Sequence, residues 1–171
     1  MKKEKLTKYF FIFLSLLVSG GIIYFRNEIA NLQGYGLLGI FLISILGNAT
    51  IVIPAPVVVT AFIGGSVFNP YLVGVIAALG ATIGELTGFL AGHGSTAVIK
   101  ETKNYEKIEK WMERSGFLTI LILAAIPNPL FDLAGIISGV TKYPIQKFLF
   151  ATMIGKTIKF VAIAVIGSIT F

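Results

Sequence analysis

Apolar residues fill most of the chain in long runs, which are separated by short polar groups and prolines. Three runs, at residues 9–25, 71–92 and 145–171, are continuous enough to predict helices that cross a hydrocarbon layer of roughly 30 Å. Lysines precede the first run, as in a signal peptide, but no A-x-A cleavage pattern follows, so we interpret it as a retained span. Residues 96–115 are polar, with apolar positions at loosely helical spacing. They predict a cytoplasmic amphipathic helix at the membrane surface, or a plain connecting helix.

Two other apolar stretches, 37–68 and 116–140, are broken near their middle. The first is too long for one span and short for two. Proline removes a backbone donor and blocks the helix before it, and lipid cannot satisfy the freed carbonyls. Such breaks persist only when they are buried in protein or line a wet cavity. We therefore predict two re-entrant helical hairpins, whose turns contain Asn48, Pro54, Pro56, Pro127, Asn128 and Pro129.

Composition fixes the class of protein and excludes several functions. The 171 residues are 56% hydrophobic and 13% charged, whereas soluble domains carry about 25% charged residues. The sequence predicts an all-α integral membrane protein with one membrane domain, residues 1–171. The net charge of +6 does not indicate nucleic-acid binding, because most basic residues flank apolar segments. The chain has no cysteine and one histidine, so we expect no metal site and no cofactor.

Two basic clusters set the expected topology. The N-terminal lysines and residues 100–114 should both face the cytoplasm by the positive-inside rule. A single crossing by residues 37–68 would place these clusters on opposite sides, whereas a hairpin keeps them on the same side. We therefore expect a multi-pass protein of the cell membrane with a cytoplasmic N-terminus. The two hairpins would enter from opposite faces.

The two halves of the chain also resemble each other. Ile53-Pro-Ala-Pro56 matches Ile126-Pro-Asn-Pro129, and Gly84-Glu85 corresponds to Gly155-Lys156 in the spans that follow. With the hairpins in opposite orientations, this pattern indicates an inverted repeat. Binding sites in such folds lie near the midplane, between broken helices.

A few charged residues lie inside apolar segments, where charge is costly and marks a functional-site hypothesis. We predict a substrate or proton pathway containing Glu85, Asp132, Lys156, Lys159 and His93. Its acids could carry protons, and its lysines could receive an anionic head group such as phosphate. Two structural alternatives stay open: Asp132 as the N-cap of the following helix, and Glu85 with Lys156 as an ion pair joining two spans.

The sequence resembles the DedA family, also described as SNARE-associated Golgi or VTT-domain proteins, over roughly residues 37–160. The first motif that supports this resemblance is Gly84-Glu-Leu-Thr-Gly-Phe-Leu-Ala-Gly-His-Gly94, which is similar to the family pattern G-(D/E)-x-x-G-Y-x-x-G-R-x-x-G. Glu85 takes the acid position, and His93 takes the position usually held by arginine. The second motif runs from Ile126-Pro to Gly139 and is followed by Tyr143-Pro-Ile-Gln-Lys-Phe148.

This chain departs from the family pattern at several charged positions and is identified as a short, divergent member. The arginines expected around the second proline turn are replaced by Ala124 or Ala125 and by Leu130. The acid that often follows the first turn is replaced by Val57 and Val58.

The resemblance implies two re-entrant hairpins in an inverted repeat. It also implies lipid handling, namely flipping of phosphate-bearing lipid carriers in bacteria or lipid scrambling in eukaryotes, with proton coupling.

The leading hypothesis is a transporter or flippase that moves a lipid with an anionic head group, either an anionic phospholipid or a polyprenyl phosphate. A transporter of a small ion or solute, and a structural or assembly factor without a substrate, are the alternatives. An enzyme is not expected, because no nucleophile–base set, phosphate loop or metal-ligand cluster appears. The expected partners are membrane lipids and protons but not nucleic acid, and oligomerisation is left open.

Overall fold

The computed structural model describes residues 35–49, 55–94, 103–128 and 130–170. The regular structure of this part of the chain is entirely helical. Its six helices are α3 (Leu37–Ala49), α4 (Ala55–Val67), α5 (Pro70–Gly94), α6 (Lys103–Ala125), α7 (Leu130–Val140) and α8 (Ile145–Thr170). The predicted first span at 9–25 lies outside the described residues, as do Pro54 and Pro129.

Local sequence explains where several helices begin and end. The Asn69 side chain accepts hydrogen bonds from the backbone amides of Tyr71 and Leu72, and Pro70 occupies the first turn of α5. After α7, the amide of Tyr143 donates to the carbonyl of Ser138, and Lys142 adopts a left-handed conformation with φ of 54°. This is the Schellman arrangement that closes a helix, and a proline follows it here as it commonly does.

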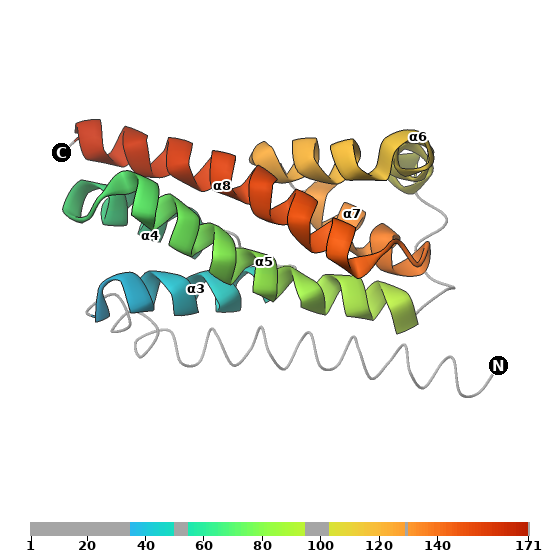
Figure 1. Ribbon diagram of the computed structural model, residues 1–171, viewed down its shortest axis with the longest axis horizontal. Coiled ribbons are helices and arrows are strands. Elements are labelled where there is room, and N and C mark those ends of the chain that lie inside the picture. Colours follow the sequence, from blue (N-terminus) through green and yellow to red (C-terminus); the bar gives the residue numbers. More distant parts are fainter. Residues whose placement is uncertain (1–34, 50–54, 95–102, 129, 171) are drawn as a thin grey trace.

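Helices α5 and α8 form the central pair and run antiparallel along the length of the molecule (Figure 1). Helices α3 and α4 pack on the half of this pair that contains the beginning of α5. Helix α7 and the apolar part of α6 pack on the other half, which contains the beginning of α8. Helix α3 packs on α5 and α4 packs on α8, while α6 packs on α8 and α7 packs on α5.

Glycines allow close approach where the short helices cross the central pair. A Cβ on Gly65 of α4 would overlap the backbone of Ala164 in α8, and a Cβ on Gly167 would overlap the backbone of Phe62 in α4. The crossing of α5 and α7 is built in the same way. There, a Cβ on Gly92 would overlap the carbonyl oxygen of Ile136, and Gly139 approaches the carbonyl oxygen of Phe89 in return.

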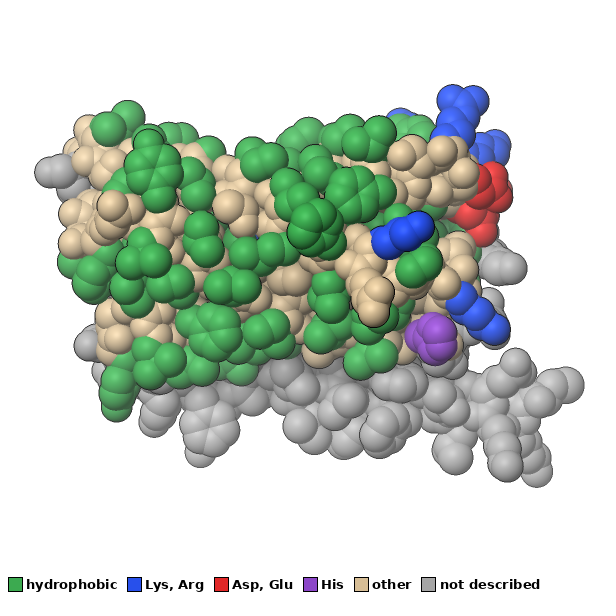
Figure 2. All heavy atoms as spheres, viewed as in Figure 1, with side chains coloured by type: hydrophobic (Ala, Val, Ile, Leu, Met, Phe, Trp, Pro, Cys, Tyr) green, Lys and Arg blue, Asp and Glu red, His purple; other side chains and the backbone are tan. Residues whose placement is uncertain are grey.

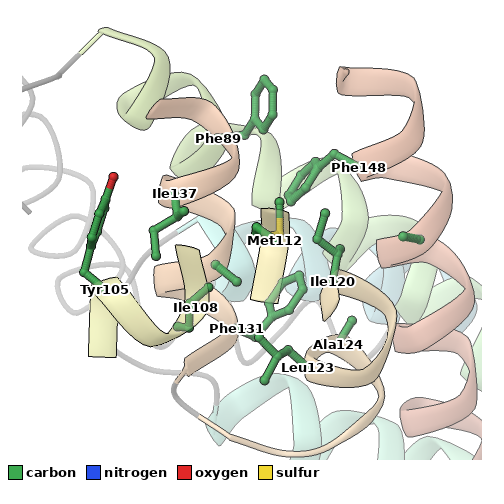
Figure 3. Packing of buried hydrophobic residues seen from close by; sticks show 12 residues of the cluster. Phe89, Tyr105, Ile108, Met112, Ile120, Leu123, Ala124, Phe131, Ile137 and Phe148 are labelled. Carbon is green, nitrogen blue, oxygen red and sulfur yellow. The ribbon is translucent and has the colours of Figure 1, made fainter. Parts of the chain in front are cut away.

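The hydrophobic core is divided into two clusters, one in each half. The first packs α3, α4, α5 and α8 and contains Ile40, Val57, Ala61, Val73, Ala77, Ala78, Ala81, Phe160 and Ala164. The second packs α5, α6, α7 and α8, and its larger side chains include Phe89, Tyr105, Ile120, Phe131 and Phe148 (Figure 3). A boundary between the two clusters therefore falls within both α5 and α8.

Helix α6 changes direction at Ser115, whose torsion angles are not helical (φ −159°, ψ 83°). The kink coincides with the position at which the sequence changes from polar to apolar. Before it, the apolar side chains Tyr105, Ile108 and Met112 are buried in the second cluster. The polar part of α6 therefore covers protein with its apolar face.

Large hydrophobic side chains cover the outside of the molecule. Figure 2 shows them over the body of the visible face, whereas charged side chains gather near one end. Helices α5 and α8 are long and apolar enough to cross a bilayer, and shorter apolar helices occupy Leu37–Ala49, Val57–Val67 and Leu130–Val140. An all-α membrane protein accounts for this surface, because exposed apolar area of this extent marks contact with a membrane or with another protein.

Candidate functional site

A buried ion pair joins the two central helices. Lys156 Nζ in α8 lies 2.6 Å from Glu85 Oε1 in α5, and the side chains are 1% and 4% exposed. Glu85 lies in α5 between Ala81 of the first core cluster and Phe89 of the second. Lys156 lies in α8 between Ala151 and Phe160, so the pair occupies the boundary between the clusters. The sequence left this pairing open, and the structure forms it.

Two further groups complete the surroundings of the Lys156 ammonium. Its Nζ donates a hydrogen bond of 2.5 Å to Asn48 Oδ1 in α3, and it lies 4.8 Å from the centroid of the Phe131 ring in α7. Lys156 therefore contacts α3, α5 and α7 from α8. These partners take the place of water around a buried side chain that would otherwise be costly to bury. We call Asn48, Glu85, Phe131 and Lys156 the polar centre.

Two more charged residues flank the polar centre. Asp132 is half-buried in the first turn of α7 and lies within electrostatic range of Glu85, Lys156 and Lys159. Lys159 is half-buried one turn beyond Lys156, and its Nζ lies 4.9 Å from the centroid of the Phe160 ring. Neither residue forms an ion pair within the described part of the chain. The structure thus brings four of the five predicted pathway residues into one region.

His93 lies apart from this region. It is exposed at the C-terminal end of α5, where its ring stacks on Phe89 with a centroid distance of 6.3 Å. His93 is more than two helical turns from Glu85, which is roughly 12 Å along the helix axis. The structure does not bring the histidine together with the buried charges.

Asn48 lies in the last turn of α3, which continues to Ala49, and residues 50–54 that follow lie outside the described residues. The Asn48 Nδ2 group donates to the carbonyl of Ser44 within the same helix. Its Oδ1 atom is then directed at Lys156. Pro56 lies in the first turn of α4, a position that tolerates proline.

The proline-containing turn between α6 and α7 is stabilised by the side chain of Asn128 and not by that of Asp132. The Asn128 Nδ2 group donates to the carbonyls of Leu123 and Ile126, at 2.9 and 2.8 Å. Its Oδ1 atom accepts a hydrogen bond from the amide of Leu130, the first residue of α7. Asp132 already lies inside the helix, so the N-cap interpretation of this residue is wrong. Asn128 satisfies carbonyls after Pro127 interrupts the helix.

Replacing Asn128 is expected to loosen this turn. Asn128→Ala removes three side-chain hydrogen bonds and should lower the free energy of unfolding by about 2 kcal/mol. Asn128→Ser retains a capping oxygen for Leu130 and should recover about half of that loss. The measurement is denaturant unfolding of the full chain in bicelles. Equal stability of both variants and the wild type would contradict this role.

Two buried hydroxyls extend the polar centre along the helices. Within the described residues, Ser44 Oγ and Thr152 Oγ1 are buried without a hydrogen-bond partner. Ser44 precedes Asn48 by one turn in α3, and Thr152 precedes Lys156 by one turn in α8. Sequence reasoning missed both hydroxyls and the Phe131 ring, because serine, threonine and phenylalanine are common in helix interiors and carry no pattern of their own.

Two contacts between α5 and α8 share one sequence separation. Glu85 and Lys156 are 71 positions apart, and so are Thr82 and Met153, whose Oγ1 and Sδ atoms are 3.8 Å apart. The same separation relates Gly84 to Gly155. Gly84 approaches the end of α3 at Ile45 and Ala49, whereas Gly155 approaches the end of α6 at Leu121 and Ala125.

The fold and site together define an all-helical membrane protein with a buried charged centre between two antiparallel apolar helices. Residues 53–169 match the model of the VTT domain. The chain therefore belongs to the VTT-domain family, which confirms the resemblance to DedA and SNARE-associated Golgi proteins.

Relatives from several organisms match parts of the chain. Vacuole membrane protein KMS2 of Arabidopsis thaliana is 48% identical over 60 residues, which are 33% of this chain and 14% of that protein. Human vacuole membrane protein 1 is 51% identical over 51 residues, which are 30% of this chain and 13% of that protein. The match thus spans about a seventh of these relatives.

A bacterial relative matches over a longer range. The uncharacterized membrane protein YbfM of Bacillus subtilis is 29% identical over 134 residues, which are 71% of this chain and 82% of that protein. No solved structure matches the chain significantly.

Proposed function

We propose that this protein moves a lipid with an anionic, phosphate-bearing head group across the cell membrane, with protons as the coupling ion. The lipid is an anionic phospholipid or a polyprenyl phosphate. The N-terminus lies in the cytoplasm, as the basic clusters of the sequence suggest. Movement of lipid, rather than catalysis, is the activity that the buried charges support.

The observation that carries this proposal is the Glu85–Lys156 pair, buried in the middle of two helices of membrane-spanning length. Ionisable groups at such depth are costly and mark substrate or proton pathways. Short helices from both halves of the molecule reach this pair, because Asn48 of α3 and Phe131 of α7 both contact Lys156. Broken helices that converge from opposite ends are typical of transporter sites.

An inverted repeat explains this convergence. In our interpretation, α3, α4 and α5 correspond to α6, α7 and α8 in the opposite orientation. Exchanging the two sets converts the packing of α3 on α5 into that of α6 on α8, and the packing of α4 on α8 into that of α7 on α5. Contacts between residues 71 positions apart would then join equivalent positions, which supports a pseudo-twofold axis close to the polar centre.

The charges supply the chemistry that the proposal needs. A phosphate entering the region would meet Lys156 and Lys159 as cations, while Glu85 accepts a proton and releases Lys156 from the ion pair. Asp132 is a second carboxylate near these lysines that could carry a proton. Helix α7 also begins beside Lys156, as the Phe131 contact indicates, so its partial positive charge favours an anion there. The re-entrant hairpins would bring both short helices to this depth.

The two unpartnered hydroxyls support a path rather than an isolated pair. Helices α3 and α8 begin at opposite ends of the molecule (Figure 1). Ser44 and Thr152 each precede the polar centre by one turn, so they flank it on opposite sides. Each can donate a hydrogen bond to a phosphate or water that approaches from its own end.

The first test separates a lipid from a small solute. Proteoliposomes containing the full chain receive a fluorescent phosphate-bearing lipid, a fluorescent lipid with a neutral head group, or entrapped phosphate ions. We expect movement of the anionic lipid with little movement of the neutral lipid and no release of phosphate. Release of phosphate without lipid movement would replace this proposal with solute transport, and no movement of any probe by folded protein would favour a structural role.

A further inference from the structure

The kink in α6 creates a second candidate site, far along the chain from the polar centre. A groove of about 310 Å³ is lined by Trp111, Arg114, Ser115, Thr119, Ile122 and Leu123. We call it the α6 groove. Arg114 is its single charged residue, and its side chain forms no ion pair or hydrogen bond within the described residues. The groove thus combines an unpaired guanidinium with an apolar floor.

The surface next to the groove continues as a strip of exposed apolar side chains. Leu118, Ile122 and Ile126 are each about half exposed, with values of 54%, 51% and 52%. Leu118 and Ile122 lie on the apolar part of α6, beyond the kink at Ser115, and Ile126 directly follows the last residue of the helix. On the other side of the kink, Lys107 Nζ lies 4.9 Å from the centroid of the Trp111 ring. The polar part of α6 also carries Glu106, Glu109 and Glu113, but none of these acids lines the groove. Arg114 therefore supplies the charge at one end of the groove, and apolar side chains form the other end.

This arrangement matches the two parts of a membrane lipid. The kink divides α6 into a polar part and an apolar part, which places the groove at the boundary between head groups and acyl chains. Arginine is well suited to bind phosphate through two parallel hydrogen bonds. Tryptophan prefers this depth, because its ring is apolar and its N–H is polar.

We propose that the α6 groove binds one anionic phospholipid, with its head group on Arg114 and an acyl chain along Leu118 and Ile122. This site lies outside the polar centre, and its occupation does not depend on whether the protein moves lipids. A free phosphate ion lacks the chain that would cover the apolar strip, so the groove is expected to select the lipid.

The sequence offers a direct probe, because Trp111 is the single tryptophan of the chain. Bromine atoms on acyl chains quench tryptophan fluorescence at short range. The full chain is reconstituted in vesicles that contain brominated phosphatidylglycerol or brominated phosphatidylcholine at equal fractions. We expect the anionic lipid to be preferred at Trp111 by about fivefold, the scale of a charge-assisted hydrogen bond weakened by exposure.

Arg114→Gln should reduce this preference to nearly one. Lys147→Gln is the matched control, since Lys147 is an exposed basic residue in the first turn of α8 and does not line the groove. This variant should keep the preference. Equal quenching by both lipids in the wild type would overturn the proposal, and so would an equal loss of preference in the two variants. Variants of Glu85 should keep the preference even when lipid movement is lost.

Discussion

Lys156→Met is expected to lower the free energy of unfolding by about 3–5 kcal/mol, because it leaves the Glu85 carboxylate buried without its partner. It also removes the hydrogen bond to Asn48 and the contact with Phe131, so α8 loses polar contacts to three helices at once. The measurement is denaturant unfolding of the purified chain in bicelles, with helix content as the signal.

A double variant separates stability from function at this pair. Glu85→Gln combined with Lys156→Met removes both charges, and neutral replacement of a buried pair is often tolerated. We therefore expect the double variant to recover most of the stability lost in Lys156→Met but to remain inactive in lipid movement. Recovery of both stability and movement would show that the pair is structural.

Gly92→Ala is expected to lower the free energy of unfolding by about 3 kcal/mol, at the upper end of overpacking costs. The added Cβ would overlap the carbonyl oxygen of Ile136, which is backbone and cannot rotate away as a side chain can. Helices α5 and α7 must then move apart, and Phe131 moves away from Lys156 with α7. Lipid movement should fall together with stability.

Gly88→Ala provides the matched control on the same helix. A Cβ there would lie 4.0 Å from Ile136 Cγ1, which is ordinary contact. Since alanine favours helix over glycine by up to about 1 kcal/mol, this variant should be as stable as the wild type or more stable. Similar effects of the two substitutions would contradict the close crossing of α5 and α7.

Hydropathy and charge were sufficient to predict the class of fold and the four charged residues in and beside the polar centre. Runs of apolar residues predicted helices near 71–92 and 145–171, where α5 and α8 are found. Glu85, Asp132, Lys156 and Lys159 stood out because each is a rare charge in an apolar segment, and no other feature was needed to select them. His93 was selected by its position in the family motif, and a motif does not show where along a helix the buried region stops.

The details of the turns could not be predicted in the same way. Asn48 and Asn128 both lie near prolines in the sequence, yet Asn48 stays helical and binds a lysine 108 positions away, while Asn128 bonds locally. An asparagine side chain has both donors and acceptors, so the hydrogen bonds that it forms depend on which partners tertiary packing brings near. The kink at Ser115 was visible as a change in polarity, but the groove beside it depends on the direction in which α6 turns.

The most direct test of lipid movement compares Asp132→Asn with the wild type in proteoliposomes. Asp132 is half-buried and forms no ion pair within the described chain, so its neutralisation should leave the fold intact. Glu106→Gln is the control, because it neutralises an exposed acid on α6.

We predict that the wild type and Glu106→Gln move the phosphate-bearing lipid at similar rates, while Asp132→Asn is slower by at least about tenfold, a barrier change near 1.4 kcal/mol. Unchanged movement in a folded Asp132→Asn protein, or no movement by the wild type, would contradict the account.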